Sequence, residues 1–343
     1  MRRQVPNDVS GSTGLRPCTV DAVAPTPRRS ESDAATAVTA LETIVIGRRR
    51  ELEIVLAALS SGRNVVLEGP PGTGKSTLLR AVAHQLDTNL VFVEGNAELT
   101  PARLLGAHDP ALVLERGYSD DTFVDGPLLS AMRAGALLYL EELNRIPEET
   151  LNILITAMAE REIHVPRVGT IHAQPAFRLV AAMNPFDSVG TGRVSGAFAD
   201  RANRVAMGYQ SARDEDQIVA NALGAEHPAL GIVSRAVALT RSSRSDRDIR
   251  IGASVRGAID LAHIAADLAA LRSTEVDNDT VTLDASLAAL TGRIRLHDGL
   301  SGDPEPVVER LWRHAFSGAT ESAPPTSGKA RAPQQQGPAP AVT

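Results

Sequence analysis

Short apolar runs alternate with stretches of helical spacing between residues 52 and 207. Leu52, Val55, Leu56 and Leu59 fall at i, i+3, i+4 and i+7, the spacing of one helix face. The apolar runs are continuous rather than alternating, which is typical of parallel strands buried on both faces. The pattern predicts strands over residues 65–67, 90–93, 136–140, 177–182 and 205–207, and helices over residues 77–86, 128–133 and 148–160. We therefore expect an α/β fold with a parallel sheet flanked by helices.

From about residue 212 onward the pattern is helical only. Val255, Ala258, Ile259, Ala262 and Ala266 form an apolar stripe at helical spacing, which is typical of a packed core. We expect four parts: a disordered tail over residues 1–36, an α/β domain over residues 37–211, a small helical domain over residues 212–316, and a disordered tail over residues 317–343. Both tails are rich in polar residues and Pro and lack an apolar period.

Composition narrows the class of protein. The chain has 343 residues, of which 43% are hydrophobic and 22% charged, values that suit a soluble globular protein. It has no apolar run of about 18 residues, so we expect no membrane segment. No apolar segment follows the basic N-terminus, and the single cysteine, Cys18, cannot form an internal disulfide. We therefore expect a cytoplasmic protein. The net charge is −6. Residues 1–30 are basic, with five Arg and two Asp, so the rest of the chain is more acidic than this total. Only 3% of residues are aromatic. These values argue against a nucleic-acid partner.

A phosphate-binding loop is the strongest motif. Gly69-Pro70-Pro71-Gly72-Thr73-Gly74-Lys75-Ser76 matches the pattern G-x-x-x-x-G-K-[ST] between a predicted strand and a predicted helix. Glycines let backbone N–H groups surround phosphate oxygens, and the helix N-terminus favours their negative charge. Lys75 is one of only two lysines in the chain; it would reach the β- and γ-phosphates, and the Ser76 hydroxyl would bind Mg²⁺. A glycine-rich turn that binds nothing is the alternative. The predicted nucleotide contacts are Gly69, Pro70, Pro71, Gly72, Thr73, Gly74, Lys75, Ser76 and Thr77.

Two carboxylates end the predicted strand 136–140. We expect this strand to lie beside strand 65–67, which would place Glu141 and Glu142 near the γ-phosphate. Glu141 would hold Mg²⁺ together with Ser76, and Glu142 would orient or deprotonate the attacking water. The usual residue at the first of these two acidic positions is Asp, so the effect of Glu141 on the rate of turnover stays open.

At this point the sequence resembles the MoxR family of AAA+ ATPases. The resemblance covers about residues 42–298. Besides the phosphate loop, it rests on four segments: Leu140–Pro147 at the acidic strand end, Asp125–Leu129 before that strand, Ala181–Pro185 at a later strand end, and Ile251–Arg256 at a helix start.

The resemblance implies a P-loop AAA+ module followed by a helical lid, with ATP and Mg²⁺ as ligands. Asn184 matches the sensor 1 residue that contacts the γ-phosphate or the attacking water, and Arg256 matches the sensor 2 residue of the lid. A turn asparagine and an exposed arginine are the alternatives for these two. Arg201 matches the arginine finger that acts on the neighbouring subunit's nucleotide; Arg204 stays a rival, because Ala202 stands where the family has Phe.

Two hairpin insertions also fit the family. Residues 111–114 would pair with residues 122–124, and residues 162–165 with residues 170–172, with Tyr118 and Arg167 at the tips. In such rings these hairpins face the pore or a partner. The segment Ile46–Arg48 either borders the adenine, as in related ATPases, or is a turn with an exposed arginine.

The resemblance implies an ATP hydrolase that forms a ring, usually a hexamer, and remodels, matures or activates a client protein, with metal or cofactor insertion as one form of this. Family members often work with a partner that carries a von Willebrand A domain. A nucleotide-dependent switch or scaffold with little turnover is the alternative. A DNA motor is a third reading, which the acidic body argues against.

Overall fold

The computed structural model describes residues 31–185, 195–298 and 302–316. It divides into two compact units, Met1–Ile218 and Val219–Thr343, which we describe separately; their boundary lies within helix α9 (Ala212–Leu223). Most of the predicted tails lies outside the described residues. Helix α1 (Glu31–Glu42) nevertheless begins inside the first predicted tail, so the expectation of disorder is wrong for residues 31–36.

The first unit is built on a parallel sheet whose order, within the described residues, is β2-β5-β8-β1-β9. Its strands are β1 (Asn64–Glu68), β2 (Leu90–Glu94), β5 (Leu137–Glu141), β8 (Arg178–Met183) and β9 (Ala202–Ala206). All neighbouring strands are parallel, as predicted. The acid-bearing strand β5 does not lie beside β1, however, because β8 lies between them, with Ala181 opposite both Val66 and Leu140. That part of the sequence prediction is wrong.

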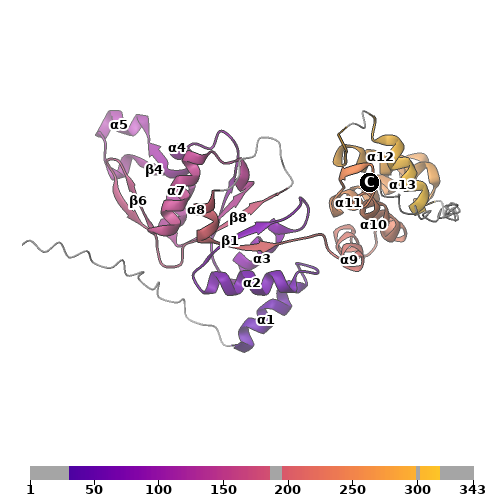
Figure 1. Ribbon diagram of the computed structural model, residues 1–343, viewed down its shortest axis with the longest axis horizontal. Helices are drawn as coiled ribbons and strands as arrows, with labels where there is room; N and C mark the ends of the chain where they lie inside the picture. The colour runs from indigo at the N-terminus through magenta and orange to yellow at the C-terminus, as the bar shows by residue number, and fades with distance from the viewer. Residues whose placement is uncertain (1–30, 186–194, 299–301, 317–343) are drawn as a thin grey trace, which may run out of the picture. The chain divides into compact units, whose positions relative to one another are not determined.

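Alternate residues of the strands face two separate hydrophobic layers, which explains why the apolar runs are continuous. Val65, Leu67 and Tyr139 pack against helices α1, α2 (Arg49–Ser60) and α3 (Lys75–Gln85). Val66 and Leu138 pack against the opposite layer. That layer contains α4 (Pro101–Leu105), α6 (Pro127–Ala134), α7 (Glu148–Ala159) and α8 (Gly196–Arg201). Helices lie on both sides of the sheet in the first unit (Figure 1).

The first insertion differs from its prediction. Residues 111–114 belong to helix α5 (Pro110–Arg116) rather than to a strand, and Asp109 caps that helix by accepting from the Ala111 N–H at 2.8 Å. An Asp N-cap followed by Pro at the first helical position is a standard helix start, and it was visible in the sequence. The strand that pairs with β4 (Phe123–Asp125) is β3 (Gly106–His108), and the 3₁₀ turn η1 (Asp120–Thr122) precedes β4.

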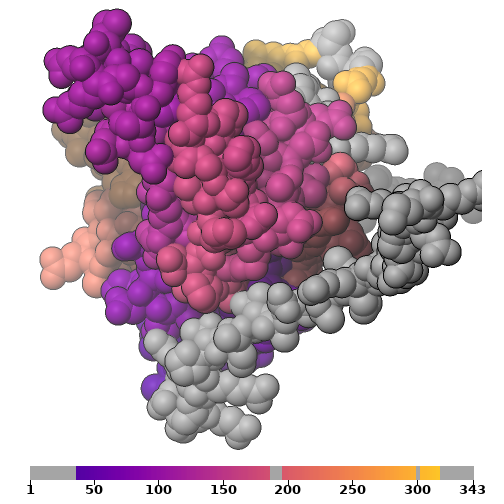
Figure 2. All heavy atoms as spheres, turned by 90° about the vertical axis from the view of Figure 1, so that its left-hand side faces the viewer, coloured from indigo at the N-terminus to yellow at the C-terminus, as the bar shows by residue number. Residues whose placement is uncertain are grey.

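The second hairpin forms as predicted. Strands β6 (Glu162–Val165) and β7 (Gly169–His172) pair antiparallel. The guanidinium of Arg167 at its tip lies 3.9 Å from the ring centre of Tyr118, so the two insertions touch. Figure 2 shows the first insertion protruding at the upper left of this face, beside the pink residues of the hairpin.

The second unit is mainly helical. Its elements are η3 (Pro228–Ile232), α10 (Val233–Ser242), β10 (Ile249–Ile251), α11 (Val255–Arg272), α12 (Asp279–Leu290), η4 (Thr291–Arg293), β11 (Arg295–Leu296) and α13 (Glu305–Phe316). The predicted stripe is largely buried on α11, including Ala258 and Ala262, which are fully buried. The expectation of helices alone is wrong in one place, because β10 and β11 form a short antiparallel ladder.

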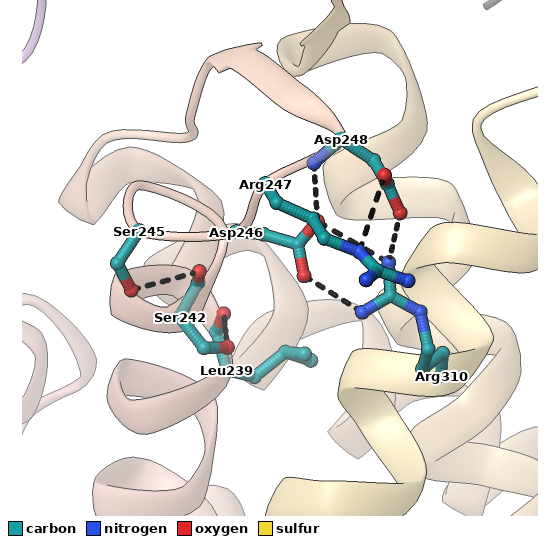
Figure 3. A network of polar contacts seen from close by, with 7 residues as sticks. All are labelled: Leu239, Ser242, Ser245, Asp246, Arg247, Asp248 and Arg310. Atoms are coloured by element: carbon teal, nitrogen blue, oxygen red, sulfur yellow. Dashed lines mark hydrogen bonds and ion pairs between the residues drawn. The ribbon is translucent and has the colours of Figure 1, made fainter. Parts of the chain in front are cut away.

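A polar network holds the last helix to the segment before β10 (Figure 3). The Arg310 guanidinium on α13 contacts Asp246 Oδ2 and Asp248 Oδ2, each at 2.7 Å. The Arg310 hydrogen bond holds the pKa of the Asp246 carboxyl below its ordinary value, against a smaller opposing effect of burial. Among the residues that the structure describes, no helix is long and apolar enough to cross a membrane.

Candidate nucleotide-binding site

The phosphate loop joins β1 to α3 at the carboxyl edge of the sheet, the edge where ligands bind in open α/β sheets. Gly72 and Gly74 have φ values of 72° and 85°, in the left-handed region that favours glycine. The Lys75 ammonium donates to the carbonyl oxygens of Gly69 and Pro70, both at 2.8 Å. Lys75 thus bonds back to the first residues of the loop, and it is also the first residue of α3.

Gly69 is required for a different reason, close packing. A Cβ at this position would lie 2.1 Å from the Met207 carbonyl oxygen, far inside van der Waals contact. The Gly69 N–H donates to the Met183 carbonyl at 3.1 Å, and the Met207 N–H donates to the Glu68 carbonyl at 2.7 Å. The loop therefore begins in a tight space between the ends of β8 and β9.

The two predicted metal ligands lie together. The Ser76 hydroxyl donates to Glu141 Oε1 at 2.7 Å, although β8 separates β1 from β5. Helix α3 makes this contact possible, because it packs over the sheet face that contains Tyr139 and its first turn carries Ser76. A third group joins them: the Tyr139 hydroxyl lies 3.1 Å from Ser76 Oγ.

Tyr139 was missed by the sequence analysis, which read it as an apolar strand residue. Its ring is fully buried, with the Phe92 ring centre 5.5 Å away. Burial raises the pKa of the Tyr139 hydroxyl above its ordinary value, the Ser76 hydrogen bond partly opposes this, and the Glu141 carboxylate adds to it. The phenol therefore stays protonated and keeps its ability to donate a hydrogen bond.

Glu142 and Asn184 follow the ends of the adjacent strands β5 and β8. Glu142 has a left-handed backbone (φ 54°), a sparsely populated conformation for a residue with a side chain. Its carboxylate contacts Arg145 Nε at 3.0 Å and is partly exposed. Asn144, two residues further on, donates to the Asn184 carbonyl at 3.3 Å, so the loop after β5 is tied to the end of β8. Glu142 and Asn184, two of the four predicted catalytic residues, thus share one edge of the sheet with the phosphate loop.

The candidate arginines differ in their surroundings. Arg201, at the end of α8, donates to the Ala197 carbonyl at 2.9 Å, and its side chain is 37% exposed. Arg204 on β9 forms an ion pair with Glu68 of the same chain, and that hydrogen bond raises the pKa of Arg204. Arg256 is exposed in the first turn of α11, in the second unit.

Of the two readings of the segment Ile46–Arg48, the turn with an exposed arginine is wrong for Arg48. It is 3% exposed, and its guanidinium donates to the Thr73 carbonyl of the phosphate loop at 3.0 Å, to the Gly208 carbonyl and to Glu51 Oε1 at 3.0 Å. It therefore joins the phosphate loop to the segment after β9. The adjacent Gly47 has a φ of 68°. A Cβ there would lie 2.6 Å from the Asp214 side chain.

The residues present suit Mg²⁺ bound with a nucleotide. Mg²⁺ prefers oxygen ligands and is usually held by one or two protein groups plus phosphates and water. The Ser76 hydroxyl and Glu141 carboxylate supply two such oxygens within 2.7 Å of each other. Over the described ranges no cluster of three or more His, Cys, Asp and Glu could hold a metal alone. A metal here would therefore need the phosphates, as in P-loop ATPases.

Comparison with known proteins agrees with this fold. Residues 64–202, from β1 to the start of β9, match the model of the AAA domain, dynein-related subfamily. An uncharacterized protein of Staphylococcus epidermidis is 33% identical over 130 residues, which are 37% of this chain and 49% of the relative. One of Staphylococcus aureus is 35% identical over the same length and the same shares. This chain thus spans about half the length of these curated relatives.

Solved structures of ATPase-like proteins are also similar. A provisionally named ATPase of Cytophaga hutchinsonii is 18% identical, with a TM-score of 0.46, covering 82% of this chain and 94% of that chain. The Holliday junction branch migration motor RuvB of Thermotoga maritima is 19% identical, with a TM-score of 0.45, covering 70% and 67%. The match of residues 64–202, together with the parallel sheet and the phosphate loop, shows an AAA-type P-loop fold in the first unit.

Proposed function

We propose that this chain is a Mg²⁺-dependent ATPase of the AAA+ class. The contact between Ser76 and Glu141 carries the proposal, because it joins the phosphate loop to the acidic strand end across an intervening strand. Lys75 would release its bonds to the loop carbonyls and bind the β- and γ-phosphates. Mg²⁺ would neutralise developing phosphate charge, and Ser76 and Glu141 would hold it.

Glu142 would accept the proton of the attacking water or orient it, and Asn184 would hold that water or the γ-phosphate. Both lie at the carboxyl ends of neighbouring strands. The Arg145 contact gives Glu142 a cationic partner. Binding of the γ-phosphate would compete for the Arg145 cation, so the base would be released as the substrate arrives.

The finer assignment is a ring ATPase that resembles the MoxR family and acts on a client protein, with a von Willebrand A domain protein as its partner. Arg201 would complete the neighbouring subunit's site. The ion pair of Arg201 with Asp200, at 3.8 Å, is looser than the pair of Arg204 with Glu68, which supports Arg201 over Arg204. A fixed guanidinium suits the charge that develops in phosphoryl transfer. Arg256 would contact the γ-phosphate from the helical unit.

The first test measures ATP hydrolysis per chain as a function of protein concentration. We expect a rate that rises with concentration and is lost in Lys75→Ala and Glu142→Gln. A rate per chain that is independent of concentration would contradict the ring. The Glu142→Gln variant with bound ATP is then used as bait in a pull-down to capture the client and the partner protein.

A mixing experiment tests action in trans. Arg201→Ala keeps its phosphate loop, and Lys75→Ala keeps its arginine finger, so each variant alone should be inactive. Mixed chains should regain part of the activity, because an Arg201→Ala site can use the finger of a Lys75→Ala neighbour. Arg204→Ala is the matched control and should keep its activity. No recovery in mixed rings would argue against Arg201 as the finger.

A nucleotide-dependent switch with little turnover is the second candidate. The strained, ion-paired Glu142 and the Glu at position 141 favour it. Tight nucleotide binding without hydrolysis at any concentration, and a gain of turnover in Glu141→Asp, would support the switch. Substantial hydrolysis that Glu141→Asp leaves unchanged would contradict it.

A further inference from the structure

The hydroxyl of Tyr139 lies inside the candidate site although its ring belongs to the core. On strand β5, Tyr139 and Glu141 are two residues apart, so both side chains point to the face that α3 covers. The ring is completely buried, whereas Glu141 is half-buried at the strand end. The hydroxyl lies 3.1 Å from Ser76 Oγ, on the side of the ring that faces the first turn of α3.

The direction of the hydrogen bonds follows from the donor count. A serine hydroxyl has one proton and two lone pairs. Ser76 donates its proton to Glu141 Oε1 at 2.7 Å, so its oxygen can only accept from Tyr139. The three side chains therefore form a chain from the Tyr139 phenol through Ser76 to the Glu141 carboxylate. One lone pair of Ser76 Oγ stays available for a metal ion.

Because residue 141 is Glu rather than Asp, a rigid hydrogen-bond donor helps to hold its carboxylate in one orientation. Glu has one more rotatable bond than Asp, so a Glu carboxylate loses more conformational freedom when it is held in one orientation. A hydroxyl donor that is itself locked in the core restricts Ser76, and Ser76 in turn restricts Glu141. Phe92 packs beside the ring on the neighbouring strand and limits its movement.

We propose that Tyr139 is a positioning residue whose hydroxyl holds Ser76 Oγ, and through it Glu141, in the orientation in which both oxygens bind Mg²⁺. It does not touch the nucleotide; it acts through the two ligands. The proposal rests on the Mg²⁺-nucleotide function proposed above. It predicts that removal of one oxygen atom, in Tyr139→Phe, weakens metal-dependent nucleotide binding while leaving metal-free binding unchanged.

The test measures the affinity of the full chain for a fluorescent ADP, first in EDTA and then across a Mg²⁺ titration. Tyr139→Phe should raise the Mg²⁺ concentration at half-effect by about 2- to 10-fold, the factor expected for one hydrogen bond. Affinity in EDTA and the melting temperature without nucleotide should stay close to wild type. In a Ser76→Ala background, Tyr139→Phe should have no further effect on the Mg²⁺ dependence.

Two controls separate the hydroxyl from the ring. Tyr118→Phe removes a hydroxyl from an exposed tyrosine of the same unit and should change nothing. Phe92→Leu loosens the packing around the Tyr139 ring but keeps its hydroxyl, so it should lower the melting temperature more than it shifts the Mg²⁺ dependence.

Three outcomes would overturn the proposal. An unchanged Mg²⁺ dependence in Tyr139→Phe, with normal binding by wild type, would refute the role of Tyr139 alone. Equal weakening in EDTA and in Mg²⁺ would show that Tyr139 shapes the loop rather than the metal ligands. Wild-type protein that binds no ADP under any condition would refute both this inference and the proposed function.

Discussion

The buried Arg48 gives a sharp test of how the phosphate loop is held. Arg48→Ala removes a guanidinium that is 3% exposed and leaves the Thr73 and Gly208 carbonyls and the Glu51 carboxylate without that donor. Glu51 itself is only 13% exposed in its side chain. Removing one partner of a buried ion pair costs about 3–5 kcal/mol. At about 2–4 °C per kcal/mol for a unit of this size, the melting temperature should fall by about 6–20 °C.

The adjacent residue is the matched control. Arg49 also pairs with acids, Glu42 and Glu53, but its side chain is 57% exposed. Exposed pairs contribute about 0–1 kcal/mol, so Arg49→Ala should melt within a few degrees of wild type. Arg48→Lys should be intermediate, because it keeps the charge and loses the planar fork of donors.

The assay is thermal and denaturant unfolding of the full chain, followed by circular dichroism, together with ADP affinity. Because Thr73 belongs to the phosphate loop, Arg48→Ala should also weaken ADP binding, which Arg49→Ala should not. If Arg48→Ala and Arg49→Ala unfold within about 1 kcal/mol of each other, the guanidinium is not a structural tie and the reasoning fails.

Two further variants test packing and charge. Gly69→Ala should abolish nucleotide binding, because its Cβ would clash with the Met207 carbonyl. Gly196→Ala is the control and should bind normally, because the space around its new Cβ is open. An ADP titration of each variant tests this. Arg310 lowers the pKa of Asp246 below its ordinary value of 3.8, so the ionised pair stabilises the second unit above that pH and the gain is lost as pH falls through the folded-state pKa. The difference in melting temperature between wild type and Arg310→Ala should therefore shrink below about pH 4, and a constant difference would contradict this account.

The parts of the site that could be predicted from sequence are contiguous motifs. The loop from Gly69 to Ser76 is identified by consecutive residues, and the apolar pattern predicts the strand and helix that flank it. Glu141 and Glu142 were found in the same way, as acids at a strand end. The order of the strands was not predictable in this way, because parallel strands are joined by crossovers and their neighbours need not be adjacent in sequence.

The errors in the fold have local causes. Residues 111–114 read as a strand because a short apolar run has no helical period, while the Asp109-Pro110 start signal outside the run decides for a helix. The strands β10 and β11 are too short to show any period. Helix α1 begins in a polar segment and continues into residues that pack on the core, such as Leu41.

The contacts of two site residues were not predicted from the sequence, and these two residues share one property. Arg48 meets partners 25 and 160 positions away, and Tyr139 meets Ser76 across 63 positions. Each side chain also serves two environments at once. The Tyr139 ring fills the core while its hydroxyl reaches the site, and an apolar pattern records only the ring. An exposed position is one reading of Arg48 because arginine is rarely buried, yet carbonyl acceptors from two distant segments make its burial favourable. Residues of this kind are therefore found only when the packing of the core and the polar atoms at its edge are considered together.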